Sequence, residues 1–186
     1  MTVHPTNTYI AQKYLAAQPD AEVMGNTVLG FTLNVLASEI GDILKKYDIE
    51  EIDPNTWYSQ QIFLDAYRDI VGNMQNATER LVAIGKATME SVEFPREVQT
   101  PQAAIKMLHE TYQMLHRNVP PSEGWDVIEH NPNHLEVLFN APYADGAAFG
   151  YLYTIANRLK PAGMTATVHP LPTPEGEIPR FEIILS

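Results

Sequence analysis

Two histidines in the middle of the chain offer the clearest chemistry in this sequence. His109 and His116 lie seven residues apart, in a segment that starts at Thr100-Pro101. Seven residues make about two helical turns, so both imidazoles would lie on one flank of a single helix. A neutral imidazole is a common metal ligand. We therefore treat both as candidate ligand-binding residues, with ordinary, partly buried helix positions as the alternative.

Two tyrosines complete the candidate site. Tyr112 lies on the apolar face of the same predicted helix, and Tyr143 lies in the segment Asn140 to Asp145 between a predicted strand and a predicted helix. Such loops often border ligand sites, and tyrosine joins an apolar ring to a polar tip. The expected ligand-binding set is therefore His109, Tyr112, His116 and Tyr143.

The composition argues against several classes of site and partner. The chain has no cysteine, which rules out disulfides, zinc-thiolate sites and cysteine nucleophiles. Its formal net charge of −11 argues against a nucleic-acid partner, because phosphate binding depends on clustered Lys and Arg. Phosphate-loop, nucleophile-elbow and zinc-helix motifs are all missing. We therefore expect a protein that is not an enzyme.

The sequence also gives an expectation for location. No apolar run approaches the ~18–20 residues that a membrane span requires, so no membrane insertion is expected. Met1 to Pro5 lack the basic start and apolar core of a signal peptide. A cytoplasmic protein is the simplest interpretation.

The first two thirds of the chain show helical periodicity. Apolar residues recur every three or four positions from Leu29 to Leu44, behind Asn26 as a cap, which predicts one long helix. Asp53-Pro54-Asn55 breaks the chain before a second apolar stripe that starts at Trp57. Asn76, followed by a glutamate three residues later, predicts a capping box. Thr100-Pro101 is the clearest helix start, because a capping hydroxyl precedes proline at the first helical position.

After Pro120-Pro121 the period changes from helical to alternating. Strands are predicted from Trp125, over 135–139, from Met164 and from Phe181, with a helix from Asp145 to Leu159 between the second and third. Helices followed by hairpins indicate an α+β fold. We predict an N-terminal helical subdomain followed by β-β-α-β-β with an antiparallel four-stranded sheet. The expected organisation is an N-terminal extension, 1–25, and one domain, 26–186, with a helical part, 26–119, and a β-β-α-β-β part, 120–186.

This order of elements resembles a known superfamily. It contains the haem-nitric-oxide/oxygen-binding (H-NOX) domains, the four-vinyl-reductase-type small-molecule-binding domains and related transport-particle subunits. The most specific part is Leu108-His109, followed about eleven residues later by Pro120-Pro121, then the strand 135–139 and the helix 147–159. In the haem-binding branch, a Leu-His pair on such a helix supplies the proximal iron ligand. The resemblance places His109 at that position.

One departure from the haem-binding pattern guides the cofactor prediction. Haem-binding members carry Tyr-x-Ser-x-Arg after the second strand, whereas the corresponding run here is Phe139-Asn140-Ala141-Pro142-Tyr143. Losing the arginine removes a bidentate partner for a haem carboxylate. The resemblance thus implies a member without haem, and no cofactor is expected. Haem is the alternative, and His109 would then be the metal ligand.

These observations favour a non-catalytic, sensor-like domain. It would hold a small, mainly apolar molecule between its helical and β parts and pass a signal to a partner protein. A haem-based gas sensor with His109 as proximal ligand is one alternative. A structural or assembly homodimer without a ligand is the other.

Overall fold

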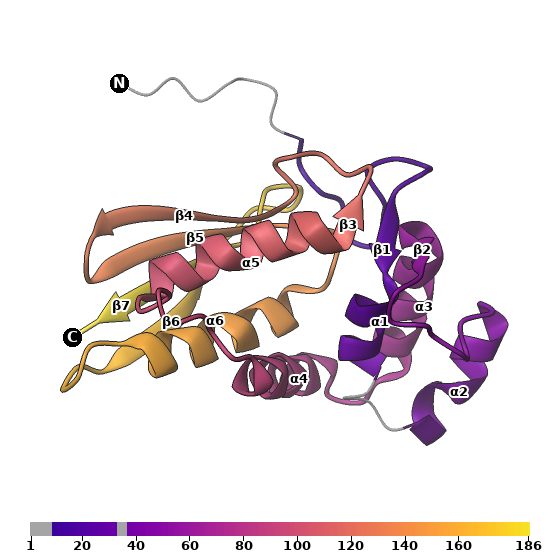
Figure 1. The fold of residues 1–186 in the computed structure, drawn as a ribbon, viewed down its shortest axis with the longest axis horizontal. Helices are drawn as coiled ribbons and strands as arrows, with labels where there is room; N and C mark the ends of the chain where they lie inside the picture. The colour runs from indigo at the N-terminus through magenta and orange to yellow at the C-terminus, as the bar shows by residue number, and fades with distance from the viewer. Residues whose placement is uncertain (1–8, 33–36) are drawn as a thin grey trace.

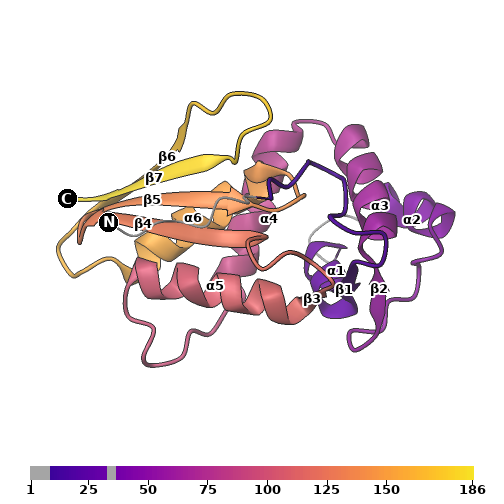
Figure 2. The same cartoon turned by 90° about the horizontal axis from the view of Figure 1, so that it is seen from above.

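The computed structural model of the chain describes residues 9–32 and 37–186. The predicted α+β fold is confirmed: helices dominate the first part, and an antiparallel four-stranded sheet follows. The helices are α1 (Gly25–Thr32), α2 (Ala37–Lys46), α3 (Gln60–Asn73), α4 (Ala77–Ser91), α5 (Pro101–Leu115) and α6 (Asp145–Leu159). The strands are β1 (Glu22–Met24), β2 (Trp57–Ser59), β3 (His116–Arg117), β4 (Gly124–Asn131), β5 (His134–Asn140), β6 (Ala166–Leu171) and β7 (Arg180–Leu185). Figures 1 and 2 show α5 and α6 beside the larger sheet, with α1, α2 and α3 gathered beyond one end of it.

The larger sheet has the order β4-β5-β7-β6, and every neighbouring pair is antiparallel. Its inner face follows the alternation of the sequence: Leu135 and Val137 are fully buried, and Phe139 nearly so. These side chains pack with the buried faces of α5 and α6 into the main hydrophobic cluster. The sheet thus holds α5, the helix of the candidate histidines, through ordinary apolar burial.

The start of α5 forms as the sequence predicts. The Thr100 hydroxyl accepts a hydrogen bond from the Ala103 backbone N–H, and Pro101 begins the helix. A helix does start after Asn76, as predicted, but the predicted capping box does not form. Asn76 has a left-handed backbone, with φ of 51°, and its side chain makes no capping bond.

A small second sheet, β2-β1-β3, was not predicted. Its central strand, β1, lies in the segment 1–25 that we expected to be an extension, and Val23 in it is fully buried. Strands of two or three residues are too short to show an alternating pattern, so the sequence gives no signal for them. Trp57, expected to open a helix, instead lies in β2, and α3 starts three residues later.

The long helix expected behind Asn26 is described in two pieces, α1 and α2. Residues 33–36, which carry part of that prediction, lie outside the described residues. So do residues 1–8, which include the segment used to predict the cytoplasmic location.

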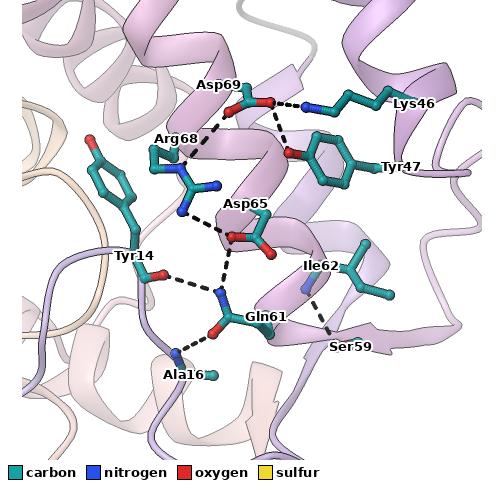
Figure 3. Close-up of polar contacts among 10 residues, drawn as sticks. All are labelled: Tyr14, Ala16, Lys46, Tyr47, Ser59, Gln61, Ile62, Asp65, Arg68 and Asp69. Atoms are coloured by element: carbon teal, nitrogen blue, oxygen red, sulfur yellow. Dashed lines mark hydrogen bonds and ion pairs between the residues drawn. The ribbon is translucent and has the colours of Figure 1, made fainter.

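Helix α3 is tied to its surroundings by polar side chains along one flank (Figure 3). Gln61 accepts a hydrogen bond from the Ala16 N–H and donates one to the Tyr14 carbonyl. One turn from the other end, Asp69 accepts hydrogen bonds from Lys46 and Tyr47 at the end of α2. These contacts hold the N-terminal segment and α2 against α3.

Helices α4 and α6 cross at very short range. A Cβ atom added at Gly150 would lie 2.3 Å from the Val82 carbonyl oxygen, and one at Gly85 would lie 2.2 Å from the Ala147 carbonyl oxygen. Real Cβ atoms do not approach backbone so closely. Both glycines are therefore required by the crossing, which forms one wall of the interior.

We predict that Gly150→Ala destabilises the fold. The added methyl group must push α4 away from α6, and such overpacking costs typically 1–3 kcal/mol, so we expect a loss of about that size or more in urea unfolding. Gly41→Ala in α2 is the matched control, because nothing lies within 4 Å of its added Cβ. That control should be neutral or stabilising by up to about 1 kcal/mol. Equal effects at the two positions would contradict the close crossing.

Candidate functional site

A cavity of about 450 Å³ lies between the helical part and the larger sheet. Its walls come from α1, α3, α4, α5 and α6, from β3, the start of β4 and the end of β5, and from the segment between β5 and α6. The wall is rich in aromatic rings: Phe31, Phe63, Tyr67, Trp125, Phe139 and Tyr151. The volume lies within the range of small-molecule sites, which are mostly apolar with a few polar groups.

The polar groups of this cavity gather where α5 ends. The His116 Nδ1 lies 2.9 Å from the Tyr112 carbonyl oxygen, and its Nε2 lies 2.8 Å from the Tyr143 hydroxyl. A carbonyl can only accept, so Nδ1 carries the proton and Nε2 accepts from Tyr143. The Tyr112 ring stacks on the imidazole, with centroids 3.9 Å apart and planes 10° apart. His116 is therefore fixed in one tautomer and one orientation.

Burial keeps the side chains of His116, Tyr112 and Tyr143 uncharged at neutral pH. It lowers the pKa of His116 from 6.5 to about 4, against the opposing effect of the hydrogen bond to Tyr112. Burial also raises the pKa of Tyr112 and of Tyr143 well above the usual value for a phenol. At neutral pH the site thus presents a neutral imidazole and two protonated phenols.

A second layer of polar groups lies behind the tyrosines. Glu123 and Gln60 are fully buried, and the Gln60 amide donates to Glu123 Oε1 at 3.2 Å. The Tyr112 hydroxyl donates to the same oxygen at 2.5 Å. Neither residue was singled out from the sequence. A lone glutamate or glutamine has no pattern, and glutamate is rarely fully buried.

The four predicted site residues do not all lie together. Tyr112, His116 and Tyr143 line the cavity, but His109 is not among the lining residues. The His109 ring lies on the flank of α5 that packs against β4, where its Nδ1 accepts a hydrogen bond from the Trp125 N–H at 3.3 Å. The expectation that His109 faces the cavity is corrected on that basis. The helix presents its neighbour Leu108 to the cavity instead.

The remaining polar groups that line the cavity are uncharged. Asn26, Thr27, Thr88, Ser91 and Thr111 contribute amide and hydroxyl groups. No Lys or Arg lies among the lining residues in the part of the chain that the structure describes. Within the same residues, no group of three or more His, Asp or Glu side chains is arranged to hold a metal ion. Any metal held at the cavity by the described residues would therefore depend on few protein ligands.

Comparison with known proteins identifies the fold. An Fe(II) unliganded H-NOX protein from K. algicida matches with a TM-score of 0.61 and 13% identity, over 88% of this chain and 97% of that chain. A mutant of that protein gives 0.62 and 14%, over 88% and 96%. A structure from a study of haem redox potential and porphyrin distortion gives 0.59 and 13%, over 87% and 96%. This chain has an H-NOX-like fold.

The resemblance inferred from the sequence is thus confirmed at the level of the fold. No protein-family model matches the chain, and no curated protein matches it. The prediction that no cofactor is involved is contradicted, because the similar solved structures named above are two forms of an Fe(II) H-NOX protein and a structure from a study of haem. The missing Tyr-x-Ser-x-Arg pattern removes one means of holding haem carboxylates, and it was wrong to infer from it that the cofactor is absent.

No helix among the described residues is long and apolar enough to cross a membrane. The cytoplasmic location, the homodimer, the signalling partner and the lack of enzymatic activity stay predictions.

We predict that His116 makes stability depend on pH. The unfolded histidine gains a proton near pH 6.5, whereas the folded one gains it only near pH 4. The unfolded state therefore binds more protons between these values, and stability falls as the pH is lowered through that window. The shift corresponds to roughly 3 kcal/mol. Urea unfolding at pH 7, 6, 5 and 4 measures it.

His116→Phe is the comparison for this prediction. It keeps a ring at the position but has no group that titrates, so its free energy of unfolding should change less between pH 6.5 and pH 4. Carboxylates such as Asp69, whose pKa is lowered by hydrogen bonds from Lys46 and Tyr47, titrate in both proteins and cancel in the difference. Parallel curves for the two proteins would show that His116 is not buried as described.

Proposed function

We propose that this chain is a non-catalytic ligand-binding domain of the sensor type, whose ligand occupies the cavity beside His116. One observation carries the proposal. A neutral imidazole, fixed in one tautomer, presents Nε2 at the wall of a large aromatic cavity. Histidines that bind metals usually donate their other N–H to a carbonyl or carboxylate, as His116 does to Tyr112.

Haem is the candidate ligand that the fold suggests. The apolar walls suit a porphyrin, and His116 Nε2 supplies a nitrogen for its iron. The amide of Asn26 is an uncharged donor that could contact its carboxylates, whereas the Thr88 and Ser91 hydroxyls donate to the backbone carbonyls of Ile84 and Thr88. A bound haem iron supplies a coordination position for a small gas molecule. Of the two histidines, His116 rather than His109 would bind the iron, because His116 lines the cavity and His109 does not.

A small apolar molecule without iron is the second candidate ligand. It is favoured by the lack of a basic side chain among the described lining residues, since such a ligand needs no partner for carboxylates. In both cases the domain would signal by shifting the helical part relative to the sheet. That requires a different affinity for two arrangements, and a partner protein to receive the signal.

Haemin titration tests the proposal. We expect the purified chain to bind haemin with a shifted Soret band. His116→Ala should weaken binding by more than the roughly 10–100-fold that loss of a second-shell partner costs. His109→Ala, seven residues earlier on α5, is the matched control, and it should keep both the band and the affinity.

A rescue experiment guards against a simple folding defect. His116→Gly leaves a space for free imidazole, which should restore the Soret band when it is added with haemin. Loss of the band in His109→Ala with an unchanged spectrum in His116→Ala would overturn the assignment. Absence of any shifted band in the folded wild-type chain would exclude haem and leave the apolar molecule.

A further inference from the structure

Two buried oxygens behind the cavity have no hydrogen-bond donor. They are Glu123 Oε2 and Gln60 Oε1, on side chains that are both fully buried. The Tyr9 hydroxyl also interacts with the Glu123 carboxyl group, whereas Gln60 Oε1 has no hydrogen-bond partner among the described residues. A buried acceptor without a donor destabilises the fold, because it has lost its hydrogen bonds to water. A nearby hydroxyl that turned toward either oxygen would therefore recover part of that cost.

The Tyr143 hydroxyl lies beside the Gln60 side chain. It now donates to His116 Nε2 at 2.8 Å. Burial raises the pKa of Tyr143, and a hydrogen bond from the Gln60 side chain works against that shift, which places the phenol beside the second layer. A phenol carries one proton. It can serve His116 or an oxygen of the second layer, but not both at once.

We propose that Tyr143 is a gate on His116. In the closed arrangement, which this structure shows, the Tyr143 hydroxyl occupies Nε2. In the open arrangement the hydroxyl donates to Gln60 Oε1 or Glu123 Oε2 and leaves Nε2 free for a ligand. The identity of that ligand rests on the proposed function. Whether the Tyr143 hydroxyl blocks Nε2 can be measured without any ligand.

The position of Tyr143 links the gate to both parts of the fold. Its ring packs against the main cluster beside the sheet and against the cluster of the helical part. It lies 6.0 Å from the Phe63 ring and 5.8 Å from the Tyr67 ring, both on α3. A turn of Tyr143 therefore changes the contact between α3 and the β part. Ligand binding at Nε2 would favour that change, because it competes with the closed arrangement.

Chemical modification of the ligand-free chain tests the gate. Diethyl pyrocarbonate acylates unprotonated ring nitrogens, and peptide mass spectrometry resolves the rate at each histidine. Tyr143→Phe removes only the hydroxyl, so the rate at His116 should rise by about three- to tenfold, the equivalent of one net hydrogen bond. The rate at His109 in the same sample is the internal control and should not change.

A second variant tests the open arrangement. Glu123→Gln replaces one oxygen of the carboxyl group with an amide NH2, which cannot accept, so the closed arrangement should be favoured and the rate at His116 should fall below that of the wild type. Circular dichroism of each variant establishes that the fold is kept. An unchanged His116 rate in folded Tyr143→Phe would overturn the gate, whatever Glu123→Gln does.

Haemin separates this proposal from the proposed function. If both hold, Tyr143→Phe should bind haemin about three- to tenfold more tightly than the wild type, in step with its modification rate. If no variant binds haemin while the His116 rate still rises, haem fails as the ligand and the gate stands. If haemin binds equally to both proteins and the His116 rate is unchanged, the gate fails and the haem site stands.

Discussion

A buried carboxylate joins the helical part of this chain to its β part. Glu123 precedes β4, and it accepts hydrogen bonds from Gln60 at the start of α3 and from Tyr112 on α5. Taking a carboxylate out of water costs several kcal/mol unless other hydrogen bonds replace its hydration. The start of α3, helix α5 and the segment before β4 are therefore held together, because separating them would leave the Glu123 side chain buried without hydrogen bonds. The walls of the cavity follow from that constraint, because α3, α5 and β4 each supply part of them.

The close approach of β4 to α5 depends on one glycine. Gly124 has φ of +126°, a conformation that side chains rarely adopt. A Cβ atom there would lie 3.0 Å from the His109 Nδ1 and 3.2 Å from the Tyr112 ring. With no side chain at this position, the Trp125 N–H reaches His109. The His109 side chain therefore accepts a hydrogen bond from the backbone of β4 and holds the strand against the helix, which is a structural role.

The larger helices and strands could be predicted from the sequence, but the buried pair of Gln60 and Glu123 could not. Proline at the start of α5, alternation in β5 and the apolar face of α6 are local signals, and each element formed where expected. Gln60 and Glu123 are 63 residues apart, and nothing in the composition around either one indicates burial. Their pairing is set by how α3, α5 and β4 pack. The same holds for β1, whose pairing with β2 and β3 has no periodic signature.

The phase of α5 explains why the Leu-His pair misdirected the choice of histidine. Leu108, Tyr112 and Leu115 line the cavity at spacings of four and three residues, as one helical face requires. His109 follows Leu108 by one residue, which turns its side chain about 100° around the helix, toward β4. His116 lies one residue beyond the end of α5, at the start of β3, and its ring stacks on that of Tyr112, which places it at the cavity. A sequence motif gives the order of residues along the chain, but which residues line a cavity depends on the helical face on which each side chain lies. The leucine of the pair faces the cavity, and the second histidine supplies its nitrogen.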